Sequence, residues 1–235
     1  MRAHAYLFLA GSDPSVSETP KTKVSDARVS VSVKTMISAI VLAAGTSSRM
    51  GEPKQMLKLG PTTLFQAVLD KVVRSRVNEV IVVLGSSADE IIRRSTLGRA
   101  KVVINGDFVE GMSSSLRAGL RALNPESKAV LVVLADQPLL SEKTLNVMIE
   151  DYVRTRSPIL APKFRARRGN PVLFDRSLFS ELQSLTGDRG AKSVVERHPD
   201  LLLEVPVEDE GVVLDIDTRE DYDRVKSKFA RMRNN

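Results

Sequence analysis

The sequence contains no cysteine, no tryptophan and only two histidines among its 235 residues. The absence of cysteine excludes disulfide scaffolds, thiolate metal sites and thiol nucleophiles. His4 lies in the N-terminal leader and His198 in a "RHPD" turn, a placement that favours neither a histidine metal site nor a general base. Because aromatic residues make up only 4% of the chain, few side chains can stack on nucleic-acid bases.

Long apolar runs are also absent. The stretches "IVLAAG", "VIVVLG" and "VLVVLA" are far shorter than the ~20 residues of a membrane-spanning helix and are typical of buried strands. Lys and Arg outnumber Asp and Glu by 35 to 29, a net charge of +6 that suits an anionic partner. Since the basic residues are scattered among acidic ones, we expect a small phosphorylated ligand rather than a nucleic acid or a membrane.

The first 35 residues differ in composition from the rest of the chain. They are rich in Ser, Thr, Pro and charge without periodicity, so residues 1–35 are predicted to be a disordered N-terminal extension. "AYLFLAG" resembles the apolar part of a signal peptide, but it is short and no cleavage site follows it. Met36 directly precedes the first strand, so the leader is either a tail or an overlong start assignment. Residues 36–235 are expected to form a single domain in the cytoplasm.

From Ile37 onwards, short apolar runs alternate with amphipathic segments, a pattern typical of parallel strands joined by helices. Strands are predicted over residues 37–43, 79–84, 101–104 and 129–135, and helices over residues 63–74, 89–94, 113–123 and 141–154. Because these strands are apolar throughout, both faces of the sheet are expected to be covered. The fold class predicted is α/β, a three-layer, Rossmann-like architecture with a mostly parallel sheet.

Beyond Pro158 the pattern becomes mixed α+β. Strands are predicted over "PILAPKF", "NPVLF", "LLLEVPV" and "GVVLDID", with a helix near residues 177–185 and a terminal helix from about Arg219. A basic turn "RARRGN" and a glycine-rich turn "TGDRG" connect these elements. No internal repeat and no linker separates this half from the first.

The segment "LAAGTSSRMGEPK", Leu42 to Lys54, begins where the first strand ends, which is where open α/β sheets bind ligands. Its glycines allow the backbone to approach phosphate oxygens, and Arg49 and Lys54 add positive charge. The segment has neither the GxxxxGK pattern of a P-loop nor the GxGxxG of a dinucleotide site, which argues against a dehydrogenase. A plain surface turn with two solvated cations is the alternative.

Carboxylates follow two later apolar runs. Asp136 comes directly after the fourth strand, on the same side of the sheet as the first loop. Asp215 and Asp217 occupy alternate positions in "VVLDIDT", so on a strand both would point to one face. Carboxylates from distant segments suit Mg²⁺, although one of the last two, or Thr218, instead caps the final helix.

Six blocks in order resemble the molybdenum cofactor nucleotidyltransferases of the nucleotide-diphospho-sugar transferase-like superfamily. They are "LAAGTSSRMGEPK", "GMSSSLRAGL", "ADQPLL", "RGNPVLF", "GDRGAK" and "DIDTREDY", and they cover essentially all of residues 37–235. The first block alone is common to many sugar nucleotidyltransferases. Within the family, Ala44 and Gln137 resemble the cytidylyltransferase branch rather than the guanylyltransferase branch.

The resemblance implies a role for each matching residue. Catalytic roles fall to Arg49, Lys54 and Asp136, and metal ligation to Asp136, Asp215 and Asp217. Nucleotide binding falls to Leu42, Ala43, Ala44, Gly45, Arg49, Lys54, Asn105, Ser113, Ser114, Ser115 and Asp136. Substrate binding falls to Arg168, Gly169, Asn170, Pro171, Gly187, Asp188, Arg189 and Gly190. From the residues alone, one serine is expected to be a helix N-cap, and Asn105 either binds nucleotide or adopts a left-handed turn before Gly106.

The activity that the resemblance implies is Mg²⁺-dependent transfer of CMP from CTP to the terminal phosphate of molybdopterin or molybdenum cofactor, with release of pyrophosphate. Such a reaction needs no protein nucleophile, in keeping with a chain without cysteine. A molybdenum hydroxylase that receives the cofactor is the implied partner. A guanylyltransferase for the same cofactor, or a nucleotidyltransferase for another phosphorylated acceptor, remains open.

Overall fold

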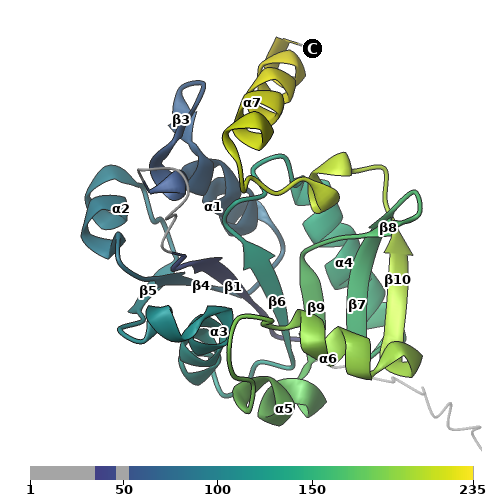
Figure 1. The fold of residues 1–235 in the computed structure, drawn as a ribbon. Helices are drawn as coiled ribbons and strands as arrows, with labels where there is room; N and C mark the ends of the chain where they lie inside the picture. The colour runs from purple at the N-terminus through teal and green to yellow at the C-terminus, as the bar shows by residue number, and fades with distance from the viewer. Residues whose placement is uncertain (1–34, 46–52, 235) are drawn as a thin grey trace, which may run out of the picture. The chain divides into compact units, whose positions relative to one another are not determined.

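The computed structural model describes residues 35–45 and 53–234. Residues 1–34 of the predicted disordered leader therefore lie outside the described residues, as does Arg49 in the first loop. Within the described part, the chain from Thr35 onwards is built around one large sheet (Figure 1).

The large sheet has eight strands in the order β10-β7-β9-β6-β1-β4-β5, with β8 paired to β7. The strands are β1 (Ile37–Ala43), β4 (Glu79–Leu84), β5 (Lys101–Ile104), β6 (Ala129–Leu134), β7 (Ile159–Phe164), β8 (Arg167–Arg168), β9 (Val172–Asp175) and β10 (Leu202–Pro206). β9 runs antiparallel to both β6 and β7, whereas β1 pairs in parallel with β4 and β6. The predicted mostly parallel α/β sheet is confirmed.

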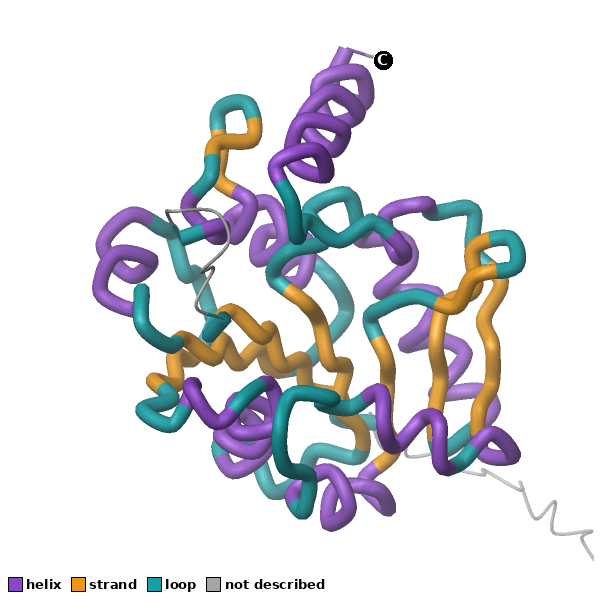
Figure 2. The backbone as a smooth tube through the Cα atoms, in the orientation of Figure 1, coloured by secondary structure: helices purple, strands orange, loops and turns teal. Residues whose placement is uncertain are grey.

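Helices cover both faces of the sheet, as the continuously apolar strands predict (Figure 2). One face packs against α1 (Leu64–Arg74), α2 (Ala88–Arg94) and α4 (Glu142–Thr155). The other packs against α3 (Met112–Arg121), α5 (Phe179–Gln183) and α6 (Lys192–Arg197). Alternate residues of β1 enter the two cores: Ala39 and Val41 enter one, and Ile40 enters the other.

A third cluster joins the C-terminal helix α7 (Arg219–Asn234) to the hairpin of β2 (Lys58–Leu59) and β3 (Thr62–Thr63). Tyr222 and Val225 of α7 are buried there together with Leu59 of the hairpin. The Tyr222 hydroxyl donates to the Lys58 carbonyl over 2.6 Å. Among the described residues, no helix is both long and apolar enough to cross a membrane.

The predicted strand over "GVVLDID" is wrong. Residues Glu210–Val213 form a 3-10 helix, η5, and the chain then runs without regular structure up to α7. The cause is close packing of Gly211 on the loop after β6, where a β-carbon on Gly211 would lie 2.3 Å from the carbonyl carbon of Leu139. The Asp209 carboxylate also accepts the Gly211 N–H over 2.9 Å. The buried apolar side chains here fill the space beside the sheet rather than extending it.

Candidate active site

The carboxyl ends of the parallel strands meet at one edge of the sheet. β1 ends at Ala43, β5 is followed by Asn105, and Asp136 follows β6 after one residue. The N–H of Ala135 donates to the Leu42 carbonyl over 3.1 Å, so β6 stays against β1 up to the point where Asp136 begins. Ligands of open α/β sheets bind at this edge, which makes it the candidate active site.

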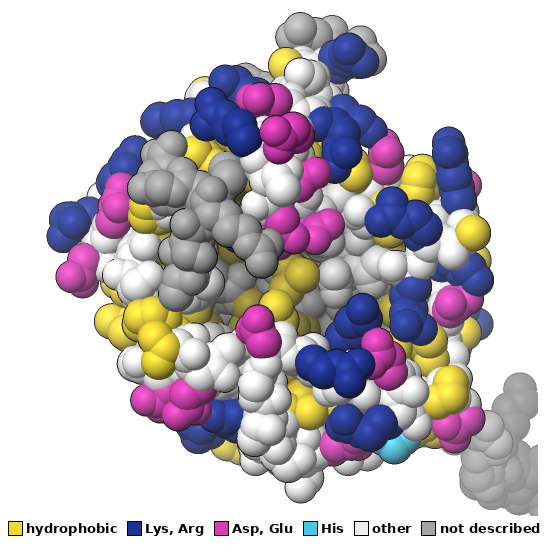
Figure 3. All heavy atoms as spheres, in the orientation of Figure 1, with side chains coloured by type: hydrophobic (Ala, Val, Ile, Leu, Met, Phe, Trp, Pro, Cys, Tyr) yellow, Lys and Arg dark blue, Asp and Glu magenta, His cyan; other side chains and the backbone are white. Residues whose placement is uncertain are grey.

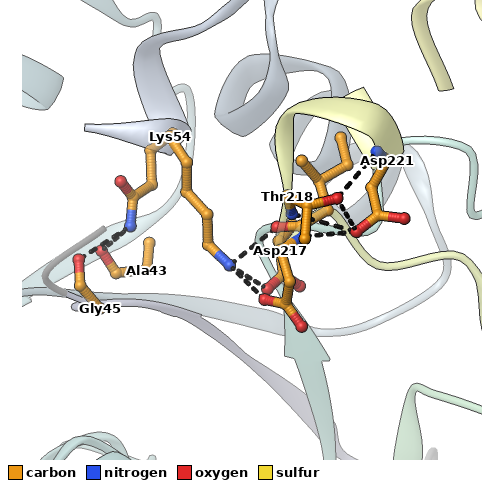
Figure 4. A network of polar contacts seen from close by, with 9 residues as sticks. Ala43, Gly45, Lys54, Asp217, Thr218 and Asp221 are labelled. Carbon is orange, nitrogen blue, oxygen red and sulfur yellow. Dashed lines mark hydrogen bonds and ion pairs between the residues drawn. The ribbon is translucent and has the colours of Figure 1, made fainter. Parts of the chain in front are cut away.

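Lys54 lies between the two carboxylates that the sequence singles out. It begins the 3-10 helix η1 (Lys54–Met56), and its Nζ lies 2.7 Å from Asp136 Oδ2 and 3.3 Å from Asp217 Oδ1 (Figure 4). The carbonyl oxygen of Ile216 accepts a third hydrogen bond from Nζ over 3.0 Å. The side chains of Lys54 and Asp136 are 18% and 21% exposed, and that of Asp217 is 52% exposed. The fold thus brings Lys54 into contact with Asp136, which is 82 positions away in the sequence, and with Asp217, which is 163 positions away.

The ammonium of Lys54 is held in its charged form. Burial lowers its pKa, but the attraction of Asp136 and Asp217 and the hydrogen bonds to both carboxylates together outweigh burial. The net result is a pKa raised above the usual value of 10.5. The lysine therefore keeps its positive charge at neutral pH, facing two acidic side chains.

The chain segment before α7 brings Asp217 to the site. The N–H of Ile216 donates to the carbonyl of Asp136 over 3.2 Å, which fixes this segment beside the loop after β6. Thr218 Oγ1 accepts the N–H of Asp221 over 3.1 Å, and the Asp221 carboxylate accepts the N–H of Thr218 over 3.0 Å (Figure 4). This reciprocal pair of hydrogen bonds makes Thr218 the residue that caps the final helix, which begins at Arg219.

Asp215 and Asp217 do not alternate on the face of a strand, because no strand forms there. Among the described contacts, Asp217 pairs with Lys54, whereas Asp215 makes no hydrogen bond to it. Burial raises the pKa of Asp215, and the negative charges of Asp136, Asp217 and Asp221 raise it further. Metal ligation by Asp215 stays a prediction, and the geometry favours Asp217.

Gln55 is a site residue that the sequence reasoning missed. It is 4% exposed, and its Nε2 donates to the carbonyls of Ala43 over 3.3 Å and Gly45 over 3.2 Å (Figure 4). These hydrogen bonds hold η1 against the end of β1, so the side chain of Lys54 extends from a backbone of fixed position. The available signal was position, because Gln55 directly follows Lys54 at the end of the glycine-rich segment.

The serines of α3 are buried in its first turn rather than placed at its cap. The predicted serine N-cap is wrong, because the N-cap residue is Gly111, whose φ of 97° disfavours a serine. Asn105 Nδ2 donates to the hydroxyls of Ser114 over 2.8 Å and Ser115 over 3.1 Å.

Asn105 also shapes the turn after β5, although not as predicted. Its φ is not positive, so the left-handed alternative is wrong. Its Oδ1 instead accepts the N–H of Asp107 over 3.1 Å, a turn made by the side chain. Nucleotide binding by Asn105, Ser113, Ser114 and Ser115 stays a prediction.

The "GDRG" turn packs on the N-terminus of α3. Asp188 Oδ1 accepts the N–H of Met112 over 3.1 Å, and the Gly187 carbonyl accepts the N–H of Ser113 over 3.1 Å. Arg189 is exposed and pairs with a glutamate of α6. In this structure the turn therefore caps a helix, and its substrate-binding role stays a prediction.

The "RGNP" segment connects to the Asp136 loop through one carbonyl group, that of Val212. This oxygen accepts the N–H of Asn170 over 2.8 Å and Gln137 Nε2 over 3.4 Å. Gly169 passes so close that a β-carbon there would lie 2.1 Å from the same oxygen. Arg168 lies exposed in β8. The described contacts thus link the predicted acceptor segment to the loop that carries Asp136.

Lys71 of α1 supports the Asp136 loop and gives a pH-dependent prediction. Its Nζ donates to the Pro138 carbonyl, and burial lowers its pKa to about 8 despite the attraction of Asp209. An unfolded lysine keeps a pKa near 10.5, so between pH 8 and 10.5 the unfolded state binds more protons and the free energy of unfolding rises with pH.

We expect this gain to be on the order of 2 kcal/mol between pH 7.5 and 10, since one pKa unit corresponds to about 1.4 kcal/mol. Urea denaturation of the wild type and of Lys71→Met at both pH values measures it. The variant lacks this titration, so the difference between the two proteins isolates the lysine. Equal pH slopes in both proteins would contradict the prediction.

Figure 3 shows this face of the molecule, with Asp and Glu side chains near its middle and many Lys and Arg side chains over β7, β8 and α6. A family model described as "MobA-like NTP transferase domain" matches residues 39–201. The chain belongs to this family. It is therefore a nucleotidyltransferase of the MobA-like NTP transferase family.

Proteins similar to this chain carry the names of different activities. "Nicotine blue oxidoreductase" of Paenarthrobacter nicotinovorans is 31% identical over 197 residues, or 80% of this chain and 96% of that protein. "Molybdenum cofactor cytidylyltransferase" of Escherichia coli is 24% identical over 200 residues, or 83% of this chain and 98% of that protein. The resemblance seen in the sequence is thus confirmed at the level of the MobA-like family.

A solved structure similar to this NTP transferase contains a metal. Rv0371c of Mycobacterium tuberculosis, in complex with manganese, matches with a TM-score of 0.72 and 33% identity, covering 82% of this chain and 99% of that chain. The two structures thus share their fold over nearly the whole of that protein.

Asp136 and Asp217 of this MobA-like chain fit a divalent cation. Both reach a single atom, Lys54 Nζ, and Asp136 Oδ1 is buried without a hydrogen-bond partner in the described part of the chain. No group of three or more His, Cys, Asp or Glu among the described residues could hold a metal. Mg²⁺ typically takes one or two carboxylates and fills its remaining positions with water and phosphate oxygens, so two carboxylates are enough.

Proposed function

We propose that this chain transfers CMP from CTP to the terminal phosphate of molybdopterin or molybdenum cofactor and releases pyrophosphate. The observation that carries the proposal is the meeting of Lys54, Asp136 and Asp217 at the carboxyl ends of β1 and β6. A cation beside two carboxylates, at the ligand-binding edge of the sheet, suits a nucleoside triphosphate with a divalent ion. The similarity to a molybdenum cofactor cytidylyltransferase supports the choice of nucleotide and acceptor.

In the proposed reaction, an oxygen of the acceptor phosphate attacks the α-phosphorus of CTP in line. A bond forms between these atoms, the bond from the α-phosphorus to the bridging oxygen breaks, and pyrophosphate leaves. The backbone of Ala43 to Gly45 contacts the nucleoside, and Lys54 neutralises charge on the triphosphate. Arg49, in the segment outside the described residues, has the same role. A Mg²⁺ ion held by Asp136 and Asp217 would add further charge neutralisation.

The acceptor is proposed to bind beside β8 and β9. Arg168 and the turn of residues 187–190 offer positive charge and backbone donors suited to a phosphorylated pterin. Gly169 to Pro171 would position Arg168, because the N–H groups of Gly169 and Asn170 donate to the carbonyls of Pro162 and Val212. The hydrogen bonds of Asn170 and Gln137 to Val212 support a fixed spacing between this acceptor region and Asp136.

The test is pyrophosphate release by purified protein with Mg²⁺, molybdopterin and each of the four nucleoside triphosphates in turn. We expect release with CTP that depends on molybdopterin. A preference for GTP would assign the guanylyltransferase reaction instead, and release only with another phosphorylated acceptor would change the substrate. A parallel assay of the oxidation or reduction of nicotine blue covers the activity named for the Paenarthrobacter relative. Turnover of nicotine blue without nucleotidyl transfer would overturn the proposal.

A further inference from the structure

We propose that Lys54 and the divalent cation are alternative occupants of the space between Asp136 and Asp217. In the absence of nucleotide the lysine fills this space and excludes the metal, so that metal and triphosphate bind together. The inference rests on the metal pair of the proposed function, and its test needs neither turnover nor acceptor.

The contacts of Lys54 Nζ are those of a small cation. All three of its described acceptors are oxygens: Asp136 Oδ2, Asp217 Oδ1 and the Ile216 carbonyl, at 2.7, 3.3 and 3.0 Å. Carboxylate and carbonyl oxygens are also the ligands that Mg²⁺ and Mn²⁺ prefer. The ammonium therefore stands where these oxygens would converge on a metal.

Charge makes the two occupants compete. The ammonium offsets one of the two negative charges of Asp136 and Asp217. A divalent ion in contact with either carboxylate would lie beside the Lys54 ammonium. Because like charges at such a short separation repel, the ion enters only if Lys54 leaves. A triphosphate offers the lysine new acceptors, so nucleotide binding removes the obstacle.

The structure lets the side chain of Lys54 move without its backbone. Gln55 fixes η1 through its hydrogen bonds to the carbonyls of Ala43 and Gly45. A lysine has four side-chain torsions, so its ammonium can shift by several ångströms from a fixed Cα. Movement from the carboxylates to a phosphate therefore requires only a change of side-chain rotamer.

The test is binding of Mn²⁺ alone, followed by electron paramagnetic resonance, to the wild type and to Lys54→Met. We expect the variant to bind Mn²⁺ about ten-fold more tightly or better, because the two carboxylates have lost their lysine. Adding CTP should tighten Mn²⁺ binding to the wild type more than to the variant. Lys228→Met is the matched control, since Lys228 pairs with Glu210 at the surface and should leave Mn²⁺ affinity unchanged.

Equal Mn²⁺ affinities of the wild type and Lys54→Met, within two-fold, would overturn the inference. So would tight binding to Lys54→Met that persists after Asp136→Asn is added, because the ion would then lie elsewhere. If Lys54→Met does not fold by circular dichroism, Lys54→Gln replaces it. If the wild type releases pyrophosphate but Lys54→Met shows no gain in Mn²⁺ affinity, only the inference is refuted. If Lys54→Met gains Mn²⁺ affinity but the wild type releases no pyrophosphate, only the proposed reaction is refuted.

Discussion

Replacing Lys54 by methionine is expected to lower the kcat of nucleotidyl transfer by about 100-fold or more, the range found when a preorganised charge-stabilising donor is removed. The lysine is the described cation that lies against both Asp136 and Asp217. In the proposed reaction it neutralises the triphosphate, and a neutral thioether cannot. The same substitution that should improve Mn²⁺ binding should therefore nearly abolish turnover.

The fold should survive this substitution. Methionine fills a similar volume, and the side chains of Lys54 and Asp136 are partly exposed. We therefore expect the free energy of unfolding to fall by about 1–2 kcal/mol, between the values for exposed and for fully buried ion pairs. Steady-state pyrophosphate release, together with the melting temperature, separates the two effects. Lys228→Met again serves as the control, with unchanged kcat expected. A Lys54→Met enzyme with more than a tenth of wild-type kcat would contradict the catalytic role.

Replacing Gly169 by alanine is expected to lower the free energy of unfolding by about 3 kcal/mol or more, or to prevent folding. A β-carbon at this position would lie 2.1 Å from the carbonyl oxygen of Val212 and 2.6 Å from its carbon. Both are backbone atoms, and the same oxygen accepts the N–H of Asn170. The clash therefore cannot be relieved by a side-chain rotation.

Gly106→Ala is the matched control, because nothing lies within 4 Å of a β-carbon there and its φ is not left-handed. Urea denaturation of both variants and the wild type measures the difference. We expect Gly106→Ala to stay within about 0.5 kcal/mol of the wild type. A Gly169→Ala protein of wild-type stability would mean that the "RGNP" glycine is not required for packing.

The boundaries of the first two strands of the large sheet followed from the sequence because burial on both faces leaves little ambiguity. Ile37–Ala43 and Glu79–Leu84 agree with the predicted ranges, and so does Lys101–Ile104, a partly exposed strand at the end of the sheet. The segment "GVVLDID" is equally apolar but forms no strand, since Gly211 packs on the backbone of Leu139. Local pattern cannot distinguish a buried strand from a buried irregular segment.

The prediction of a serine cap for α3 was wrong for a related reason. Ser113, Ser114 and Ser115 are good capping residues by type, yet the helix begins earlier, at Met112. The turn containing Asp188, 76 residues away, supplies the cap. A partner so distant in sequence leaves no local signal.

By itself, the sequence determined that apolar strands alternate with helices and that a cationic loop and a carboxylate lie at the same edge of the sheet. It did so because strand direction fixes which end of each strand faces that edge. Only the tertiary structure decided that Lys54 bridges Asp136 and Asp217, that Gln55 anchors η1, and that Asp217 rather than Asp215 reaches the lysine. These choices depend on close packing of the chain before α7 against the loop after β6, and contacts between such distant segments follow from how the whole chain fills space.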